Sequence, residues 1–244
     1  MPQVESQSRF YPASATTKYR SGMALSETAQ PKPSLITSPL GRVFGSFIGW
    51  ALFSFCMMLL LQGFFSLMSI GGSCASGGPY SIEVECPDAV ALFMPLSIYG
   101  GLAAVALSLF LARGFGTSLV ILAWPILFCS LGGGFLWAFF VAGDTIGLVI
   151  GVMFEVMGLI PLALALRANP QLVFLGAINV RGERFYEGEN PKTSFLGPRY
   201  ESSENGARPT AVDWSYSLAI LIVALGLGYY AARAAYAAVG AGPA

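Results

Sequence analysis

The 244-residue chain contains no histidine. Histidine is the usual general base near neutral pH and the commonest protein ligand of metal ions. Its absence excludes histidine-ligated haem and nucleophiles that histidine activates, such as Ser-His and Cys-His pairs. No other pairing of a nucleophile with a base is visible in the sequence. We therefore expect neither an enzyme nor a bound cofactor or metal ion.

Charged residues are also scarce. They make up 11% of the chain, against 55% hydrophobic residues, whereas a soluble domain carries roughly 25% charged residues. This composition is typical of a membrane protein. Lys and Arg together number 13, as do Asp and Glu, so no basic excess indicates binding to nucleic acid.

Long apolar runs account for this composition. A helix needs about 20 apolar residues to cross a bilayer, and five runs reach that length: 43–70, 89–111, 117–141, 145–166 and 214–236. The runs are continuous rather than alternating, which favours helices over a β-barrel. Short turns join the second run to the third and the third to the fourth, so these neighbours form antiparallel hairpins. The sequence predicts an all-α bundle of five membrane-spanning helices with a short disulfide-bonded outer loop.

Two polar segments flank these runs. Residues 1–42 are rich in Ser, Thr, Pro and Gln, which predicts a disordered tail; a phosphorylation or partner-binding role is the alternative. Residues 167–213 form the other sizeable polar segment. Within it, residues 171–189 mix β-branched and aromatic side chains around an Arg-Gly turn, which indicates a short hairpin or an interfacial segment.

The basic residues are distributed unevenly. With five membrane crossings, every Lys and Arg except Arg233 falls on the same side as the N-terminus. Because basic residues gather in cytoplasmic loops, we expect the tail and the loop 167–213 in the cytoplasm and the C-terminus outside. The excess of Arg over Lys, with abundant Ala and Gly, is typical of GC-rich bacterial genomes. The expected location is thus a bacterial cell membrane.

The segment 71–88 connects the first two runs and contains two of the four cysteines. The predicted topology places it outside the cell, where disulfides persist. We expect a disulfide between Cys74 and Cys86, which stabilises by about 3 kcal/mol in the chain-entropy model. A redox-active pair is the alternative, although the sequence contains no Cys-X-X-Cys motif.

Gly41, Gly45 and Gly49 form a tandem G-X-X-X-G pattern near the start of the first run. Residues four apart lie on the same face of a helix, and stripes of small residues let membrane helices approach closely. The pattern predicts a helix-packing surface. We expect it to contact another helix of this chain; packing on a second protein is the alternative.

Glu155 is the one carboxylate within an apolar run. Gly147 and Gly151 precede it on the same helix face, so we expect Glu155 to face the bundle rather than lipid. The turn near Gly143 lies twelve residues before Glu155. Counting twelve residues back along the third run predicts that Ser130 and the glycines 132–134 lie at the same depth.

Gln62 in the first run and Tyr99 in the second complete a predicted polar cluster with Glu155 and Ser130. A charged residue at the bilayer centre costs about 2.5–3.5 kcal/mol on insertion scales, so we expect Glu155 to be protonated or hydrogen-bonded. Two roles are open. Glu155 acts in a proton or ion relay or in ligand contact, or it fixes the helix register as a neutral hydrogen-bonding group.

Several short stretches carry a resemblance to known proteins: GGSCASGGPY, ECPDAVALF, ARGFGT, LAWPILF and LALR. Together they resemble a group of uncharacterised integral membrane proteins from actinobacteria, over residues 40–235. The resemblance implies a multi-pass membrane protein and no particular activity. The paired cysteines after the first run are similar in layout to claudin-type accessory proteins. Those have four spans and a Trp-Gly-Leu-Trp element that this sequence lacks, so only the architecture is analogous.

The absence of catalytic groups, the glycine stripes and the short loops favour an accessory or assembly subunit of a larger bacterial membrane complex, for example a lipid importer or a respiratory assembly. The expected partners are membrane lipids and other membrane-protein subunits. A small transporter or channel that uses Glu155 is the alternative, although five spans without inverted repeats are unusual for a transporter.

Overall fold

The computed structural model describes residues 38–70, 86, 88–143, 145–185 and 206–239. All of them belong to a single unit that spans residues 33–244. Five helices are long and apolar enough to cross a membrane, and they are α1 (Pro39–Ser69), α2 (Asp88–Ala112), α3 (Leu119–Ala142), α4 (Thr145–Ala168) and α6 (Ala211–Ala238). A short helix, α5 (Pro170–Leu175), lies between α4 and α6 in the sequence. The prediction of an all-α fold with five long apolar helices is confirmed.

The first helix begins earlier than the apolar run. Of the predicted tail 1–42, residues 1–37 lie outside the described residues, but residues 39–42 are helical rather than part of a tail. The backbone N–H of Gly41 donates to the hydroxyl oxygen of Ser38 at 3.0 Å, which caps the helix. Pro39 occupies the first turn, where its missing N–H costs nothing.

The last long helix also begins before its apolar run, at Ala211 rather than residue 214. Thr210 and Asp213 form a capping box. The carboxylate of Asp213 accepts from the backbone N–H of Thr210 at 2.9 Å, and the N–H of Asp213 donates to the hydroxyl of Thr210 at 3.3 Å. The box satisfies two N–H groups that a helix start would leave unpaired.

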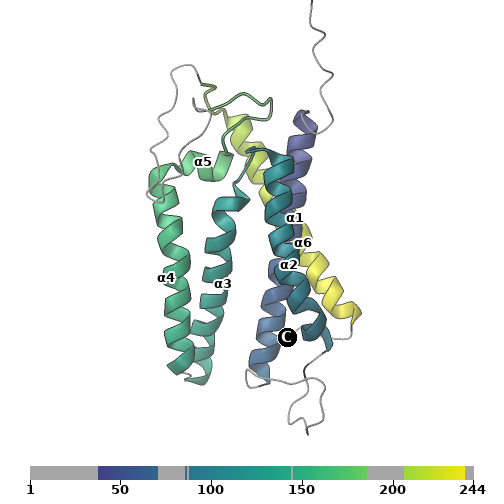
Figure 1. Cartoon of the computed structure of the whole chain (residues 1–244), viewed down its shortest axis with the longest axis vertical. Helices are drawn as coiled ribbons and strands as arrows, with labels where there is room; N and C mark the ends of the chain where they lie inside the picture. Colours follow the sequence, from purple (N-terminus) through teal and green to yellow (C-terminus); the bar gives the residue numbers. More distant parts are fainter. Residues whose placement is uncertain (1–37, 71–85, 87, 144, 186–205, 240–244) are drawn as a thin grey trace, which may run out of the picture. The chain divides into compact units, whose positions relative to one another are not determined.

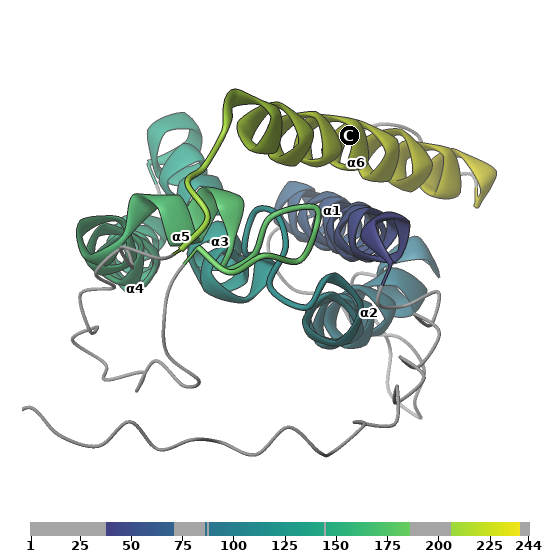
Figure 2. The same cartoon turned by 90° about the horizontal axis from the view of Figure 1, so that it is seen from above.

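The long helices form two groups. In the first, α1 packs against α2 on one side and α6 on the other, as Figure 1 and Figure 2 show. In the second, α3 and α4 form an antiparallel hairpin whose turn contains Gly143 at a left-handed φ of 71°. Glycine is favoured there because it has no Cβ. The two groups contact each other through α3, far less extensively than the helices within each group.

Apolar contacts join the groups in two places. The core cluster contains residues of α1, α2, α3 and α6, including Trp50, Leu119 and Ala224, which are almost fully buried. Toward the C-terminal end of α3, the rings of Phe64 and Phe135 pack edge to face with their centroids 4.8 Å apart. Gly134 makes this approach possible, because a Cβ there would lie 2.7 Å from a ring carbon of Phe64.

One end of each long helix lies on the same side of the bundle as α5 (Figure 1), and we call this side the α5 end. The sequence indicated a short hairpin or an interfacial segment at residues 171–189. Residues 170–175 form the helix α5 rather than a strand of a hairpin, and residues 186–189 lie outside the described residues. The N–H of Leu172 donates to the side chain of Asn169 at 3.0 Å, which caps this helix. A tight turn follows, with one isolated antiparallel bridge between Ile178 and Arg184.

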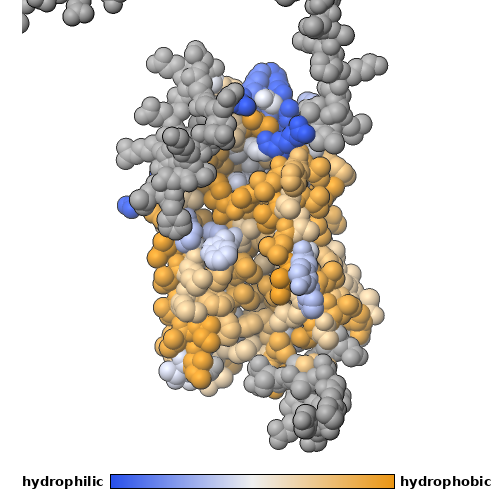
Figure 3. Space-filling model, in the orientation of Figure 1, coloured by the Kyte–Doolittle hydropathy of each residue, from blue (hydrophilic) through white to orange (hydrophobic). Residues whose placement is uncertain are grey.

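The surface over the long helices is mainly apolar. Figure 3 shows that, on the face it presents, the most hydrophilic described residues gather at the α5 end. Large exposed side chains occur on every long helix. This distribution fits helices whose surroundings are lipid along their length and water near α5.

Candidate functional site

Glu155 lies near the middle of α4, on the helix face that packs against α3. Gly147, Gly151 and Gly158 on this face are buried, and Glu155 is partly buried among them. Without side chains, the glycines let the two backbones approach closely: a Cβ added to Gly151 would lie 2.8 Å from Cγ of Leu136. The stripe therefore joins α4 to α3 and brings Glu155 to their interface.

The carboxyl group of Glu155 faces glycines of α3. A Cβ added to Gly132 would lie 3.1 Å from Oε1 of Glu155 and 3.0 Å from its backbone nitrogen. One added to Gly133 would lie 3.8 Å from the same Oε1. A larger residue at position 132 would displace the carboxyl group or the α4 backbone, so the glycines are what makes room for the acid.

Cys129 is a neighbour of Glu155 that sequence reasoning missed. Its thiol interacts electrostatically with the carboxyl group. Its Sγ also lies against Gly158, where an added Cβ would come within 2.5 Å of it. A signal was available, because Cys129 precedes Gly132 by one helical turn and therefore lies on the same face of α3.

Within the described residues, no hydrogen bond joins Glu155 to the other members of the predicted cluster. Tyr99 of α2 is 73% exposed. Gln62 belongs to α1, where its Oε1 is buried without a hydrogen-bond partner among the described residues. Ser130 lies beside Cys129 in the sequence, yet no hydrogen bond within the described ranges joins it to Glu155. For Gln62 and Tyr99, the reason is the division into two groups: α4 packs on α3, and equal depth in a membrane does not bring α1 or α2 to it.

The glycine stripe of α1 packs within the chain. A Cβ added to Gly45 would lie 2.5 Å from Cβ of Leu111, and one added to Gly49 would lie 2.8 Å from Cβ of Ser108. Both neighbours belong to α2. Gly41 is partly buried and donates its N–H to the cap of α1. Positions 45 and 49 are thus covered by α2 and have no room for a second protein.

A polar junction at the α5 end ties the two helix groups together, and sequence reasoning missed it. The indole N–H of Trp50 in α1 donates to the backbone oxygen of Thr117 at 2.9 Å. Ser217 of α6 donates to the backbone oxygen of Phe174 at 2.6 Å, and the Thr117 hydroxyl lies 3.1 Å from both groups. Trp50, Thr117 and Ser217 are almost fully buried. Because these buried groups have partners, the junction is structural.

The turn between α2 and α3 belongs to this junction. The N–H of Ser118 donates to the backbone oxygen of Val173 at 2.8 Å, and the N–H of Ala177 donates to that of Gly114 at 2.7 Å. Gly114 and Gly116 have φ angles of 86° and 78°, which glycine adopts without strain. Pairing with the chain around α5 therefore fixes the backbone of this turn.

None of the known protein families, curated proteins or solved structures compared with this chain matches it. The resemblance to actinobacterial membrane proteins stays a prediction. Across the described ranges, no three His, Cys, Asp or Glu residues cluster as metal ligands would. The ionisable groups that the structure places together at Glu155 are one carboxyl group and one thiol.

The cysteines divide into two kinds. Cys56 and Cys129, both within long helices, are free thiols. Cys86 is not among the free cysteines, and Cys74 lies outside the described residues. The pairing of Cys74 with Cys86 stays a prediction.

Proposed function

We propose that the chain is a multi-pass membrane protein that acts as an accessory or assembly subunit of a larger membrane complex. The position of Glu155 is the observation that supports this function. Its carboxyl group lies near the middle of α4 and is covered on one side by α3. On the neighbouring flank, Val152 and Leu159, one turn before and one turn after Glu155, are 49% and 51% exposed.

A carboxyl group in a membrane that its own chain covers only in part is stabilised by a partner. An acidic residue at the centre of a membrane helix costs about 2.5–3.5 kcal/mol on insertion scales, and such residues almost always face protein. The glycines of α3 offer no side-chain donor, and the thiol of Cys129 is a weak one. A hydroxyl, amide or basic side chain from a second membrane protein would satisfy Glu155.

The apolar surface of α4 is extensive enough for such a partner. Its exposed large side chains are Ile146, Val149, Val152, Met153, Val156, Met157, Leu159, Ile160 and Leu164. Lipid would cover this surface equally well. The carboxyl group at its edge is therefore what favours a protein, with membrane lipids covering the rest.

We place the α5 end in the cytoplasm of a bacterial cell. Its arginines form no ion pair in the part of the chain that the structure describes, and they are Arg42, Arg113, Arg167, Arg181, Arg184 and Arg208. Basic residues gather on the cytoplasmic side of the membrane. This orientation leaves Arg233 and the segment 71–88 toward the outside, where a disulfide between Cys74 and Cys86 would persist.

Site-specific photo-crosslinking tests the partner. A photoreactive amino acid is placed at Val152 or Leu159 in the full-length chain, and at Tyr230 as a control, since Tyr230 is 71% exposed on α6. We expect both α4 positions to cross-link to one membrane protein and the control position not to do so. Native mass spectrometry from a mild detergent should then show a complex of fixed stoichiometry.

Two variants of Glu155 separate this function from a transporter or channel. Glu155→Gln keeps the size and hydrogen bonding of the side chain and should retain the complex, whereas Glu155→Leu should lose it. In a transporter, the chain would purify alone and conduct ions in liposomes, and Glu155→Gln would abolish the flux because an amide does not ionise. Two results would refute the accessory function: purification of the wild-type chain without a stoichiometric partner, or retention of the partner by the Glu155→Leu variant.

A further inference from the structure

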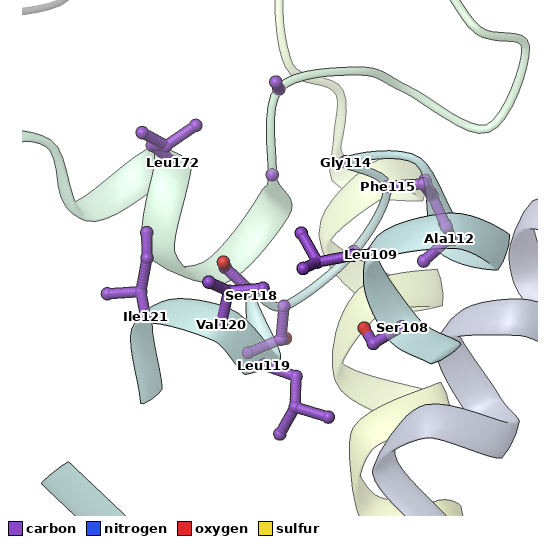
Figure 4. A pocket seen from close by; sticks show the side chains of 14 residues that line it. Ser108, Leu109, Ala112, Gly114, Phe115, Ser118, Leu119, Val120, Ile121 and Leu172 are labelled. Carbon is purple, nitrogen blue, oxygen red and sulfur yellow. The ribbon is translucent and has the colours of Figure 1, made fainter. Parts of the chain in front are cut away.

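A cavity of about 190 Å³ lies beside the polar junction, between α2 and α3. Its walls come from the last turns of α2, the turn after it, the first turn of α3 and the region of α5, as Figure 4 shows. Most lining side chains are apolar. Leu109 of α2 and Val120 of α3 line the cavity and are 55% and 45% exposed. Their exposure places the mouth of the cavity between these helices, on the side where lipid would lie.

Three residues with hydroxyl groups interrupt the apolar lining: Ser108 of α2, Thr117 in the turn and Ser118 before α3. The hydroxyl of Thr117 already belongs to the polar junction, and Figure 4 shows the other two. Ser108 is 7% exposed and forms no hydrogen bond within the described ranges. Ser118 occupies the capping position of α3 without a capping bond from its side chain. Buried hydroxyl groups normally have partners, so the lining suits a ligand that carries oxygen atoms.

The first turn of α3 adds donors to the same cavity. Leu119, Val120 and Ile121 line it, and the first N–H groups of a helix have no acceptor within the helix. These groups and the helix dipole favour an anion at this position. The first turn of α3 therefore gives the cavity the chemistry of an anion site, beside the apolar side chains of Leu109 and Val120.

Arg113 is the cation nearest to this cavity in the sequence. It does not itself line the cavity, but it connects Ala112 and Gly114, which both do, and it is exposed without an ion pair in the described ranges. Its φ of 50° is the one positive value at a non-glycine residue in the described ranges. Glycine would adopt this conformation without strain. An arginine that its surroundings hold in a strained conformation points to a function of its side chain.

We propose that this cavity binds an anionic phospholipid from the membrane leaflet at the α5 end. The phosphate lies between Arg113 and the first turn of α3, because guanidinium groups and helix starts both bind phosphate. The ester oxygens of the lipid lie near Ser108 and Ser118. One acyl chain leaves between α2 and α3 along Leu109 and Val120. The cavity is smaller than the roughly 300–1,000 Å³ of pockets that enclose drug-sized ligands, which fits a ligand that is only partly enclosed.

Lipid binding by the full-length chain tests the site. The protein is purified in a mild detergent, mixed with phosphatidylglycerol or with phosphatidylcholine of the same acyl chains, and examined by native mass spectrometry. Arg113→Asn removes the cation while keeping a residue that tolerates a left-handed backbone. Arg181→Asn makes the same change at an exposed arginine of the α5 end whose neighbours in the sequence, unlike those of Arg113, do not line the cavity.

We expect the wild-type chain and Arg181→Asn to bind phosphatidylglycerol in preference to phosphatidylcholine. Arg113→Asn should bind phosphatidylglycerol about tenfold more weakly, as the loss of one charge-assisted hydrogen bond predicts. Val120→Trp should weaken binding by narrowing the mouth without changing any charge, and it decides the question if Arg113→Asn does not fold. Unchanged binding in Arg113→Asn or in Val120→Trp, an equal loss in both arginine variants, or equal binding of the two lipids overturns the proposal.

Discussion

Replacing Gly228 of α6 by alanine should destabilise the chain, whereas the same change at Gly226 should not. A Cβ added to Gly228 would lie 2.6 Å from the backbone oxygen of Ala51, 2.6 Å from Cβ of Ser54 and 2.7 Å from the backbone nitrogen of Phe55. A Cβ added to Gly226 would meet nothing within 4 Å. The chemical change is identical and the positions are two residues apart, so the comparison isolates the packing of α6 on α1.

The magnitude follows from these distances. Non-bonded carbon atoms settle about 3.5–4.0 Å apart, so α6 has to move away from α1 by about 1 Å. Such overpacking costs about 1–3 kcal/mol. The movement also breaks the hydrogen bond from the Ser54 hydroxyl to the backbone oxygen of Leu225, 3.0 Å long, which is worth about 1 kcal/mol. The higher helix propensity of alanine compared with glycine offsets about 1 kcal/mol of this destabilisation. Gly228→Ala is therefore destabilising by about 1–3 kcal/mol, and Gly226→Ala is neutral or stabilising by up to about 1 kcal/mol.

Thermal unfolding in detergent, followed by tryptophan fluorescence, measures the difference. For a chain of this size, 1 kcal/mol shifts the melting temperature by about 2–4 °C, so Gly228→Ala should melt several degrees below Gly226→Ala. Size-exclusion chromatography checks that both variants are monodisperse before heating. Equal melting temperatures would refute the reasoning, because they would mean that α6 does not approach α1 closely at Gly228.

Three further predictions concern the junction, the cysteines and the topology. Trp50→Phe removes the indole N–H that donates at 2.9 Å to a buried backbone oxygen. The melting temperature should fall by the equivalent of about 1–3 kcal/mol. The control Trp124→Phe, at a residue that is 51% exposed, should change the melting temperature little. Peptide mapping without reductant should find Cys74 joined to Cys86, and two free thiols in protein from oxidising surroundings would contradict this pairing. A cysteine introduced at Ser14 should react with an impermeant maleimide only after permeabilisation; reaction in intact cells would reverse the proposed orientation.

The number of long helices could be predicted from the sequence because it depends on one property, the length of an apolar run. The starts of α1 and α6 could not be predicted from the same property. Ser38 and the pair Thr210–Asp213 are polar and lie outside the apolar runs, yet their hydrogen bonds determine where the helices begin. Capping is a local signal of side-chain type and spacing, so a search for caps beside each run would have found both starts.

Contacts within the α3–α4 hairpin could be anticipated, whereas contacts between the two helix groups could not. A short turn fixes the relative depth of two antiparallel helices, which is why counting from Gly143 leads close to Gly132 as the neighbour of Glu155. Depth does not determine which helices adjoin or how each is rotated about its axis. Tyr99 is therefore exposed on α2 instead of meeting Glu155. The polar junction could not be predicted from the sequence for another reason. One of its acceptors is the backbone oxygen of Phe174, and the pattern of side chains in a sequence does not indicate which backbone oxygen accepts a hydrogen bond.

The two proposals meet on the α3–α4 hairpin. α4 is held by α3 and, at its last turns, by α5, so a partner that contacts Glu155 acts on the rest of the chain through the junction at the start of α3. The cavity beside Arg113 lies at that junction, where it separates α2 from α3. A phospholipid that fills it would restrict the movement of the hairpin relative to α1, α2 and α6, and would make a partner's site on α4 more rigid before binding.

Because coupling between two sites is reciprocal, phosphatidylglycerol would then strengthen the complex, and the partner would strengthen lipid binding. The measurement is the fraction of chain in the complex with and without phosphatidylglycerol, compared between the wild type and Arg113→Asn. A complex of equal strength under all four conditions would show that the two sites act independently.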